Sequence, residues 1–490
     1  MTDSTPELGE MNLDEFRRHG HELIDWIADY LEHPEQFPVL SRCRPGEILA
    51  QLPKSPPARS ESMEQILADF KDILLPGVTH WNHPGFFAYF GITGSGPGIL
   101  GELLMSALNI NAMLWRTSPA ATELEEVTLD WLRQMLGLPD GLDGVIMDTA
   151  SVASMVAIAA AREALSLEVR GKGLAGRPDL PRLRLYVSDQ THSSVEKGAI
   201  TLGIGQENVV KIPTDAAFRL QPLELLAAIE ADLAAGYRPF FVCATVGTTS
   251  TTSIDPVAEI ADIAARYGLW FHVDGAYGGV AAMLPEKREI LFGAERADSI
   301  VVNPHKWLFT PIDCSAFYTR RPEVVKQAFS LVPEYLRNVE TDAKLVKDYM
   351  DYGVQLGRRF RALKLWMVIR YFGYEGLAAR IREHIRLAQL FAAWIDDSAV
   401  FERLAPTPLS TVCFRAHPPG LENKEELNRF NEDLLNAVNE TGEIFISHTK
   451  LNGKYTLRLA IGNIRSDEKQ VVWAWNLLQA GAAKMVGGKA

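Results

Sequence analysis

Apolar segments and helical segments alternate along the middle of the chain. The apolar segments are short, rich in β-branched and aromatic residues, and lie at residues 184–189, 239–247, 269–279 and 298–303. Apolar residues at helical spacing separate them, as at 222–234 and 256–267. Strands that are apolar on both faces and alternate with helices are typical of a mainly parallel sheet covered by helices. The pattern therefore predicts an α/β domain.

The first part of the chain follows a different pattern. Apolar residues recur at helical spacing from Leu13 to Leu31, and Pro34 and Pro38 then stop the helix. A second helix is predicted at 63–75. Because one amphipathic helix cannot bury its apolar face alone, we expect this region to pack on the rest of the chain or on a second subunit.

A long helical pattern at 361–381 leads out of the alternating region into a last part that shows both strand and helix patterns. The length of 490 residues is enough for two or three units. We therefore expect an N-terminal helical segment at 1–84, a large α/β domain at 85–375 and a small C-terminal α+β domain at 376–490.

The composition is that of an ordinary globular protein, with 47% hydrophobic and 23% charged residues. The formal net charge of -13 makes nucleic acid or an anionic membrane surface an unfavourable partner, because both would be repelled. No window of about 18 apolar residues is present, so we expect no membrane span. The four cysteines form no CxxC pair, and the polar, acidic N-terminus is unlike a signal peptide. We therefore expect a cytoplasmic protein without a disulfide framework or a metal site.

Four polar side chains stand at the ends of predicted strands. Asp274, Thr245 and His192 end or follow three of them, and Lys306 comes just after the fourth, between a histidine and a tryptophan. Taken singly, these residues are typical of a turn, a structural histidine or a solvated lysine. Taken together they indicate chemistry, because the carboxyl ends of parallel strands meet at one edge of a sheet. A lysine in an apolar pocket can form a Schiff base, and an aspartate can partner a protonated pyridine nitrogen. Pyridoxal phosphate requires both groups.

A candidate phosphate site lies upstream of these residues. A strand-like run is followed by Thr149, Ala150 and Ser151 and then by a helix of small residues at 153–161. Free N–H groups at such a helix start, together with hydroxyls, suit an anion, whereas the same residues alone would be an ordinary helix cap. With an aspartate and a lysine downstream, we interpret this turn as a phosphate cradle.

Ten motifs occur in one order along nearly the whole chain: NHPGFFAYF, SPAATELE, DTAS, SDQTHSSVEKG, ATVGTT, HVDGAYGG, NPHKW, DCSAF, LGRRFRALKLW and LRLAIGN. In this order they resemble the pyridoxal-phosphate-dependent group II amino-acid decarboxylases, and among them the aromatic-L-amino-acid decarboxylases. The resemblance implies pyridoxal 5'-phosphate as cofactor. It also implies the fold-type I architecture: a mainly parallel seven-stranded sheet in a large domain, a smaller C-terminal α+β domain, and an N-terminal helical segment swapped between the subunits of a homodimer with shared active sites.

The resemblance assigns a role to each candidate residue. Lys306 would be the Schiff-base lysine, Asp274 the partner of the pyridine nitrogen, and His192 the residue stacked on the ring. Tyr349 matches the tyrosine of a loop that returns a proton to the α-carbon of the substrate, and we expect the segment 333–355 around it to be a protease-sensitive lid. Other residues near the cofactor would be Ala150, Ser151, Thr245, Ala276, Asn303 and His305, and those near the substrate Trp81, Tyr89, Phe90, Met113 and Gly357, with 111–113 reaching over from the partner subunit.

The chain departs from this family pattern at a few positions. Asp148 stands where many members carry glycine, and Val152 where a glutamate is common. Gly91 and Ile92 replace the proline and threonine of animal-type enzymes, and Met113 occupies a position that is often aromatic. These changes concern the pocket wall, so they bear on substrate identity more than on the chemistry.

The function predicted in this way is decarboxylation of an aromatic L-amino acid, such as tryptophan, 5-hydroxytryptophan, tyrosine, dopa or phenylalanine. Three alternatives are an aromatic acetaldehyde synthase, in which phenylalanine replaces the loop tyrosine, a decarboxylase of histidine or an acidic amino acid, and a non-catalytic cofactor-binding protein. Gly357 matches a position where plant relatives with glycine accept indoles and those with serine favour hydroxyphenyl substrates. We therefore expect an indole amino acid to be accepted.

Overall fold

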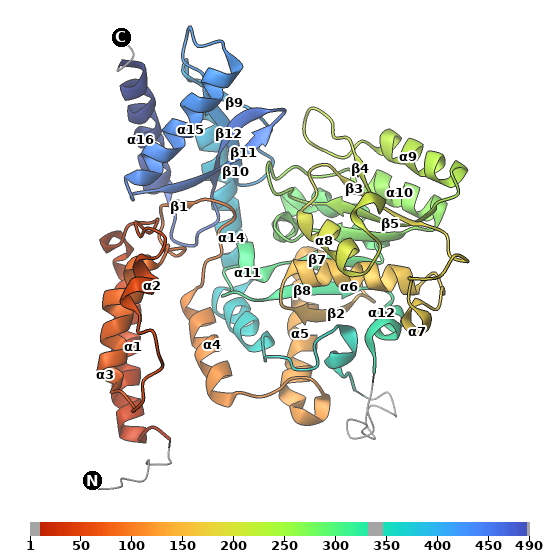
Figure 1. The fold of residues 1–490 in the computed structure, drawn as a ribbon, viewed down its shortest axis with the longest axis horizontal. Coiled ribbons are helices and arrows are strands. Elements are labelled where there is room, and N and C mark those ends of the chain that lie inside the picture. The colour runs from red at the N-terminus through yellow and green to blue at the C-terminus, as the bar shows by residue number, and fades with distance from the viewer. Residues whose placement is uncertain (1–9, 332–345, 488–490) are drawn as a thin grey trace.

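The computed structural model describes residues 10–331 and 346–487. They form an N-terminal helical segment, a large α/β domain and a small C-terminal α+β domain (Figure 1). The part of the predicted lid that runs from residue 333 to 345 lies outside the described residues.

The large domain is built on a seven-stranded sheet. Its strands are β2 (Asp143–Met147), β3 (Leu183–Ser188), β4 (Val209–Ile212), β5 (Arg238–Thr245), β6 (Trp270–Asp274), β7 (Ser299–Val302) and β8 (Ser315–Thr319). Their order is β2-β8-β7-β6-β5-β3-β4, and β8 runs in the direction opposite to the other described strands of this sheet. The central strands are buried almost throughout, as in a sheet covered on both faces.

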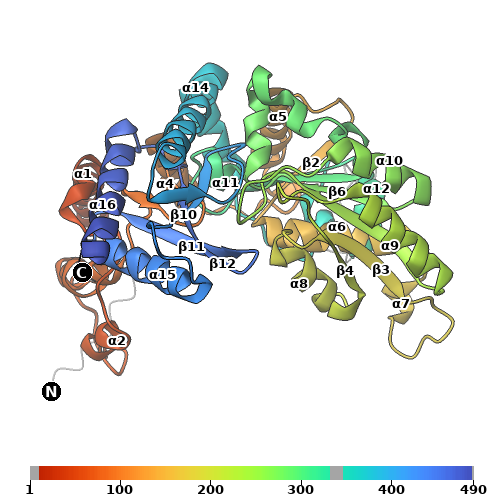
Figure 2. The same ribbon diagram turned by 90° about the horizontal axis from the view of Figure 1, so that it is seen from above.

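Helices cover both faces of this sheet (Figure 2). One face carries α6 (Ala150–Glu163), α8 (Ser193–Thr201) and α12 (Pro322–Phe329), with the short α7 (Val169–Lys172) at its margin. The other carries α5 (Pro119–Leu136), α9 (Pro222–Ala234) and α10 (Val257–Tyr267). The alanines of α6 that face the strands, such as Ala153 and Ala157, are fully buried, because their small side chains let the helix lie close to the sheet.

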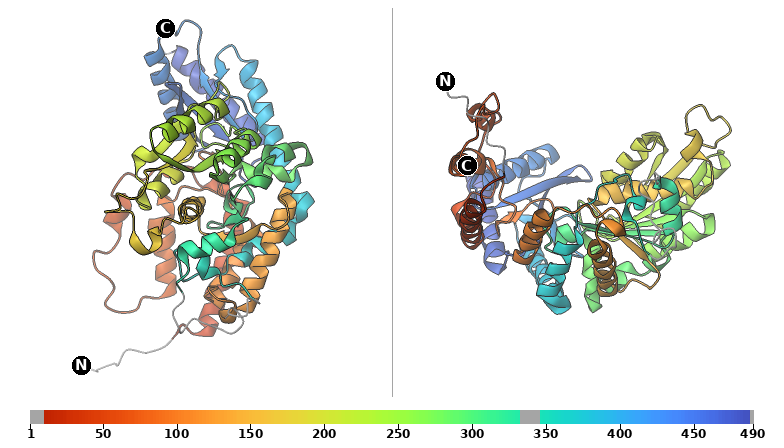
Figure 3. Two further views of the ribbon diagram at one scale, coloured as in Figure 1. Left: turned by 90° about the vertical axis from the view of Figure 1, so that its right-hand side faces the viewer. Right: turned by 90° about the horizontal axis from the view of Figure 1, so that it is seen from below.

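The N-terminal segment comprises α1 (Leu13–Glu32), α2 (Glu47–Gln51) and α3 (Met63–Asp69), and a π-helical turn at Phe70–Leu74 extends α3. It lies beside the C-terminal domain, away from the large sheet (Figure 3). Among the hydrogen bonds that join these parts, the Arg42 guanidinium donates to the Thr441 carbonyl at 2.9 Å, and the Val39 N–H donates to the Gly442 carbonyl at 2.8 Å. From this segment the chain enters the large domain through α4 (Gly96–Leu108).

The C-terminal domain holds a five-stranded sheet of β1 (Phe86–Phe87), β9 (Phe401–Arg403), β10 (Thr411–Ala416), β11 (Phe445–Leu451) and β12 (Lys454–Ala460), in the order β1-β11-β12-β10-β9. The helices α14 (Ala362–Asp396), α15 (Lys424–Glu440) and α16 (Glu468–Gly487) accompany it. Strand β1 comes from the early part of the chain and pairs in parallel with β11. The helix α14 runs continuously from the large domain into the small one, apart from non-helical backbone at Gly373.

The mainly parallel seven-stranded sheet and the smaller C-terminal domain confirm the predicted fold class. The boundaries 1–84, 85–375 and 376–490 stay predictions. The pairing of β1 crosses the first of them, and the second falls inside α14 just after Gly373. Within residues 10–331 and 346–487, no helix combines the length and the apolar character needed to cross a membrane.

Candidate active site

The carboxyl ends of the central strands bring the predicted polar residues together. Thr245 ends β5 and Asp274 ends β6, and the two are paired in register. Asn303 follows β7 directly and begins α11 (Pro304–Trp307), a single turn that carries Lys306. His192 stands after β3 as the N-cap of α8. The topology therefore brings these residues together at the carboxyl ends of the central strands, although the sequence places them at separate strand ends.

The two neighbours of Lys306 fix the turn on which it stands. The Trp307 ring stacks on Tyr277 with centroids 4.8 Å apart, and its indole N–H donates to His384 Nδ1 at 2.9 Å. On the other side, His305 Nδ1 accepts from the Cys314 N–H at 2.9 Å. Because both aromatic neighbours are buried and bonded, α11 has one orientation, which turns the lysine toward a cavity.

Burial governs the charge of Lys306. It lowers the pKa of the ammonium, and the charge of Asp274 opposes this effect in part. The Nζ atom lies 5.5 Å from the centre of the Phe90 ring. A lysine held in this way gives up its proton more readily than a solvated one, which is what a Schiff-base nucleophile requires.

Asp274 and His192 border the same cavity. Asp274 is 4% exposed, and its Oδ1 accepts from the Ala276 N–H at 3.0 Å. His192 Nδ1 accepts from the Ser194 N–H at 3.2 Å, and burial lowers the pKa of the imidazole. His192 is therefore a neutral ring in a fixed orientation, with its other nitrogen free to carry the proton.

The start of α6 supplies the anion-binding end of the cavity. The N-cap residue Thr149 makes no side-chain capping bond, so no capping side chain occupies the N–H groups of Ala150 and Ser151. This fourteen-residue helix directs the positive end of its dipole at the cavity. Asn303 and His305 line the same space.

These residues fit pyridoxal phosphate. A primary amine with a lowered pKa, a buried carboxylate and an uncapped helix start surround one cavity of about 190 Å³. The amine suits the aldehyde of the cofactor, the carboxylate its ring nitrogen and the helix start its phosphate. The cavity is lined by Phe90, Thr149, Ala150, Ser151, His192, Thr245, Gly247, Thr249, Asp274, Ala276, Tyr277, Asn303, His305 and Lys306.

A second cavity, of about 340 Å³, shares Phe90, His192, Thr249 and Lys306 with the first. Its further lining includes the predicted substrate residues Trp81 and Tyr89, whose rings stack with centroids 5.8 Å apart. The remaining lining residues are Ile92, Ser250, Ser447, His448, Thr449 and Arg458. An aromatic wall next to the lysine suits a flat side chain.

Arg458 is the charged residue among the lining residues that the sequence analysis missed. It is 4% exposed, and its guanidinium donates to the carbonyl oxygens of Thr249 and Ser250 at 2.8 and 2.7 Å and lies 5.4 Å from the centre of the Phe90 ring. A buried arginine beside the lysine offers a cation for a substrate carboxylate. The signal was an arginine between two leucines in the middle of an apolar strand, in the motif LRLAIGN.

Three predicted residues do not line either of these cavities: Met113, Tyr349 and Gly357. They gather elsewhere. The Met350 N–H donates to the Met113 carbonyl at 3.1 Å, and a Cβ placed on Gly357 would lie 3.8 Å from Asn111 Nδ2. The segment expected to reach the partner subunit and the tyrosine segment therefore form one unit.

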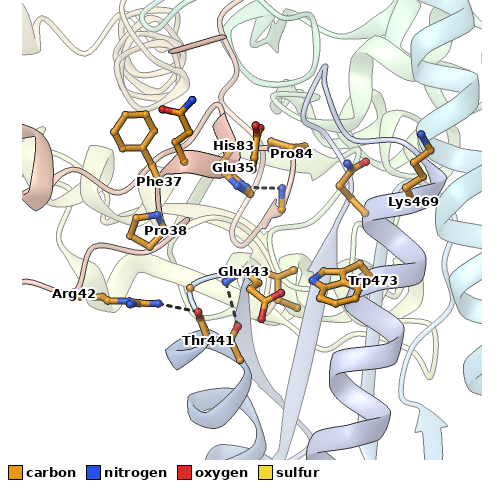
Figure 4. Close-up of a pocket in the computed structure, with 15 residues that line it drawn as sticks. Glu35, Phe37, Pro38, Arg42, His83, Pro84, Thr441, Glu443, Lys469 and Trp473 are labelled. Atoms are coloured by element: carbon orange, nitrogen blue, oxygen red, sulfur yellow. Dashed lines mark hydrogen bonds between the residues drawn. The ribbon is translucent and has the colours of Figure 1, made fainter. Parts of the chain in front are cut away.

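The cavity at the lysine is not the largest in the molecule. A cavity of about 720 Å³ lies between the N-terminal segment and the C-terminal domain, with Arg42, His83, Glu443, Lys469 and Trp473 among its lining residues (Figure 4). We place the candidate active site by chemistry rather than by size, because Lys306 and the buried carboxylate of Asp274 border the smaller cavities.

Comparison with known proteins agrees with this geometry. Residues 45–417 match the pyridoxal-dependent decarboxylase conserved domain. Phenylacetaldehyde synthase of Arabidopsis thaliana is 44% identical over 487 residues, which cover 98% of this chain and 98% of the relative. Tryptophan decarboxylase 2 of Oryza sativa subsp. japonica is 42% identical over 488 residues, covering 98% and 97%.

A solved structure shows the same fold. The crystal structure of Oryza sativa TDC with PLP and tryptamine has a TM-score of 0.94 to this chain at 39% identity, covering 98% of this chain and 99% of that one. The likeness extends over all three parts of the molecule. The chain therefore belongs to the pyridoxal-phosphate-dependent decarboxylases, in their group II aromatic-L-amino-acid branch.

Proposed function

We propose that this enzyme decarboxylates an aromatic L-amino acid to the aryl-alkylamine and carbon dioxide. The observation that carries the proposal is that Lys306 borders two cavities at once, one with the buried carboxylate Asp274 and one with the aromatic wall of Trp81, Tyr89 and Phe90. Pyridoxal phosphate, when bound, supplies the electron sink for the bond that loses carbon dioxide.

Each of the site residues has a part in this chemistry. With the cofactor bound, Asp274 would hold a proton at its ring nitrogen, and His192 would lie against the ring as a neutral imidazole. Arg458 orients the carboxylate of the incoming substrate. Lys306 would hold the cofactor through its amine until the substrate amine binds, and Tyr349 would supply a proton to the α-carbon.

The second candidate function is an aromatic acetaldehyde synthase, because relatives with both names match the chain closely. Tyr349 favours the decarboxylase, since a phenol at this position is a proton donor and phenylalanine is not. A decarboxylase of an acidic amino acid is disfavoured, because the described lining of the substrate cavity carries no arginine or lysine besides Arg458 and Lys306.

We propose further that the enzyme is a homodimer whose subunits complete each other's sites. Several apolar side chains are between 41% and 74% exposed on the described chain: Leu13, Phe16 and Ile24 on α1, and Leu100, Leu103, Leu104 and Leu108 on α4. Large exposed apolar surfaces mark interfaces. Tyr349, Met113 and Gly357 line neither cavity at their own chain's Lys306, which supports a role for them at the partner's site. The cytoplasmic location and the lack of a nucleic-acid or membrane partner stay predictions from composition.

Product analysis tests the reaction. The purified enzyme is incubated with pyridoxal phosphate and, separately, with tryptophan, 5-hydroxytryptophan, tyrosine, dopa, phenylalanine, histidine and glutamate. We expect the amine from one or more aromatic substrates, with carbon dioxide in equal amount. Aldehyde and peroxide as the main products would establish the second candidate, and turnover restricted to histidine or glutamate would contradict both.

Mixed dimers test the shared site. Lys306→Ala and Tyr349→Phe subunits are each expected to make little amine. If Tyr349 serves the partner, a heterodimer of the two holds one site with both native residues and recovers amine formation. Absence of recovery in verified heterodimers would place both residues in one chain's site.

A further inference from the structure

The aromatic wall of the substrate cavity belongs to an early part of the chain, yet its backbone is bonded to the C-terminal domain. The wall consists of Trp81, Tyr89 and Phe90. In the sequence between Trp81 and Tyr89 lies strand β1, which pairs with β11 of the C-terminal sheet (Figure 1). The Tyr89 N–H donates to Ser447 Oγ at 3.1 Å, also on β11. The position of the wall over the cavity therefore depends on the C-terminal domain.

Asn463, three residues after the end of β12, binds the same backbone with its side chain. This side chain is fully buried, and its Nδ2 donates to the carbonyl oxygens of Trp81 and His83 at 3.1 and 2.7 Å. Its Oδ1 accepts from the Arg465 N–H at 2.9 Å. Because a buried amide N–H without a partner is costly, only this orientation of the amide is favourable. Both donors of the amide therefore hold the segment that carries Trp81.

A contact between two glycines brings the end of the wall against the same loop. A Cβ placed on Gly91 would lie 2.8 Å from the carbonyl carbon of Gly462 and 3.2 Å from the backbone nitrogen of Asn463. The first distance is well inside van der Waals contact between two carbons, so a side chain at Gly91 would push the two backbones apart. Gly91 is one of the positions at which the chain departs from its family pattern, and this contact gives the departure a reason.

The backbone of Asn463 leads in the other direction, to the turn that carries the lysine. It is hydrogen-bonded to the His384 imidazole, whose Nδ1 accepts from the Trp307 indole N–H at 2.9 Å. His384 is 3% exposed and Trp307 is fully buried. Trp307 directly follows Lys306 on α11. One residue therefore connects the lysine turn, through its backbone, with the facing aromatic wall, through its side chain.

We propose that Asn463 is a positioning residue that sets the distance between Lys306 and the aromatic wall, and thereby how tightly an aromatic side chain is bound. The proposal rests on the proposed function, which makes this wall part of the substrate site. Asn463 lines neither cavity at Lys306, so it acts through the backbone of Trp81. A change of its side chain leaves its backbone bond to His384 in place. The effect therefore falls on binding of the ring rather than on the chemistry at Lys306.

The test compares the holoenzyme variants Asn463→Asp and Asn463→Ala with the native enzyme. Aspartate has the shape of asparagine and keeps an oxygen for the Arg465 N–H, but it places its other oxygen against the two wall carbonyls. We expect both variants to raise KM for tryptophan and for tyrosine by about tenfold, as for a lost buried hydrogen bond, with kcat within about threefold of native. If KM stays native in Asn463→Asp, or if kcat alone falls, the proposal is wrong.

Asn431 provides a matched control in the same domain. It is also fully buried, and its Nδ2 donates to the carbonyl oxygens of Ala416 and Leu427 at 2.8 and 2.9 Å, away from the wall. Asn431→Asp therefore removes the same kind of contact and is expected to keep the native KM. An equal rise of KM in this control would show that any damage to the C-terminal domain has the effect, which overturns the proposal.

A second variant reaches the same contact from the other side. Gly91→Ala adds the Cβ that meets the Gly462 backbone, and it is expected to raise KM in the same direction as Asn463→Asp. Gly171→Ala, at a glycine whose added Cβ would meet nothing within 4 Å, is its control. A native KM in Gly91→Ala contradicts the proposal even where an Asn463 variant fails to fold.

Hydrogen exchange gives a readout that does not depend on turnover. Backbone amides of residues 81–92 should exchange about tenfold faster in Asn463→Asp than in the native enzyme and in Asn431→Asp. Unchanged exchange overturns the positioning role, and faster exchange with a native KM overturns its link to substrate binding. If the native enzyme turns over no aromatic amino acid, the proposed function fails, while the exchange result still decides whether Asn463 holds the wall.

Discussion

The guanidinium carbon of Arg358 lies 4.7 Å from the centre of the Tyr349 ring. Arg358 itself is bound, with Nη2 at 2.7 Å from Glu125 Oε1 and both side chains buried. Burial, reinforced by the charge of Glu125, raises the pKa of Tyr349 well above its ordinary value, while Arg358 opposes the shift. The phenol is therefore held in its protonated form near neutral pH.

Tyr349→Phe tests this donor. The variant keeps the ring against Arg358 and loses only the hydroxyl, which has no hydrogen-bond partner to leave behind among the described residues. We expect little change in folding stability and a change of main product from amine to aldehyde, peroxide and ammonia. Quantifying amine and peroxide in one reaction checks the prediction. Tyr371→Phe, at a tyrosine that is 73% exposed on α14, is the control. Amine yield that stays native in Tyr349→Phe would falsify the assignment.

Lys306→Ala tests the Schiff-base lysine. Loss of the covalent nucleophile should reduce amine formation by at least about a thousandfold, within the range of a removed catalytic group. The neighbouring stack of Trp307 on Tyr277 should keep the fold, so the melting temperature should stay near that of the native enzyme. Lys211→Ala, which removes an exposed lysine paired with Glu196, is the control. Native-like amine formation by the Lys306 variant contradicts the role.

Gly357→Ser tests substrate choice. A Cβ at this position meets Asn111 Nδ2 at 3.8 Å, an ordinary contact, so serine fits without strain. We expect kcat/KM to fall more for tryptophan than for tyrosine, by about 10–200-fold, because a filled pocket discriminates against the larger ring. Steady-state kinetics with both substrates on both proteins measures the effect. Parallel losses would leave Gly357 as a backbone contact without influence on specificity.

Acid sensitivity follows from buried neutral histidines. Burial lowers the pKa of His384, and likewise of His83, His272 and His305, to about 4 in each case. The unfolded chain binds these protons near pH 6.5 and the folded chain does not. Their contribution to the free energy of unfolding is therefore complete above pH 6.5 and is lost as pH falls toward 4, at about 1.4 kcal/mol per pH unit for each histidine.

The variant His384→Asn isolates one of these groups. Its amide oxygen can still accept from the Trp307 indole N–H, and it does not titrate. We expect the free energy of unfolding to fall less steeply between pH 6.5 and 4.5 than in the native enzyme, by about 1.4 kcal/mol per pH unit. Urea unfolding at three pH values measures the slopes. The exposed His21→Asn should keep the native slope. Burial raises the pKa of Asp255 to about 7, so the contribution of Asp255 to the free energy of unfolding grows as pH falls. This contribution is the same in the native enzyme and in both variants.

The sequence predicted those parts of the site that strands position. The strand predicted at 298–303 is observed as β7 at Ser299–Val302, and its register alone brings Lys306 to the edge where Asp274 stands. Arg458 was missed because the alternation of side chains along a strand does not show which of its two faces will line a cavity. That face is decided by the packing of β12 against the loop at Thr249. The hydrogen bond from the Tyr352 hydroxyl to Asp143 could not be predicted for the same reason, since these residues meet through tertiary contact only.

The parallel pairing of Phe86–Phe87 with β11 has a consequence for how the chain is made. During synthesis Phe86 and Phe87 leave the ribosome long before Phe445 and Ile446 have been made. Strand β1 therefore stays unpaired through most of synthesis. A recombinant fragment of residues 376–490 would expose the backbone of β11 along a bare sheet edge, a template for association with other copies. The C-terminal domain is therefore a poor candidate for separate expression, although its sequence looks self-contained.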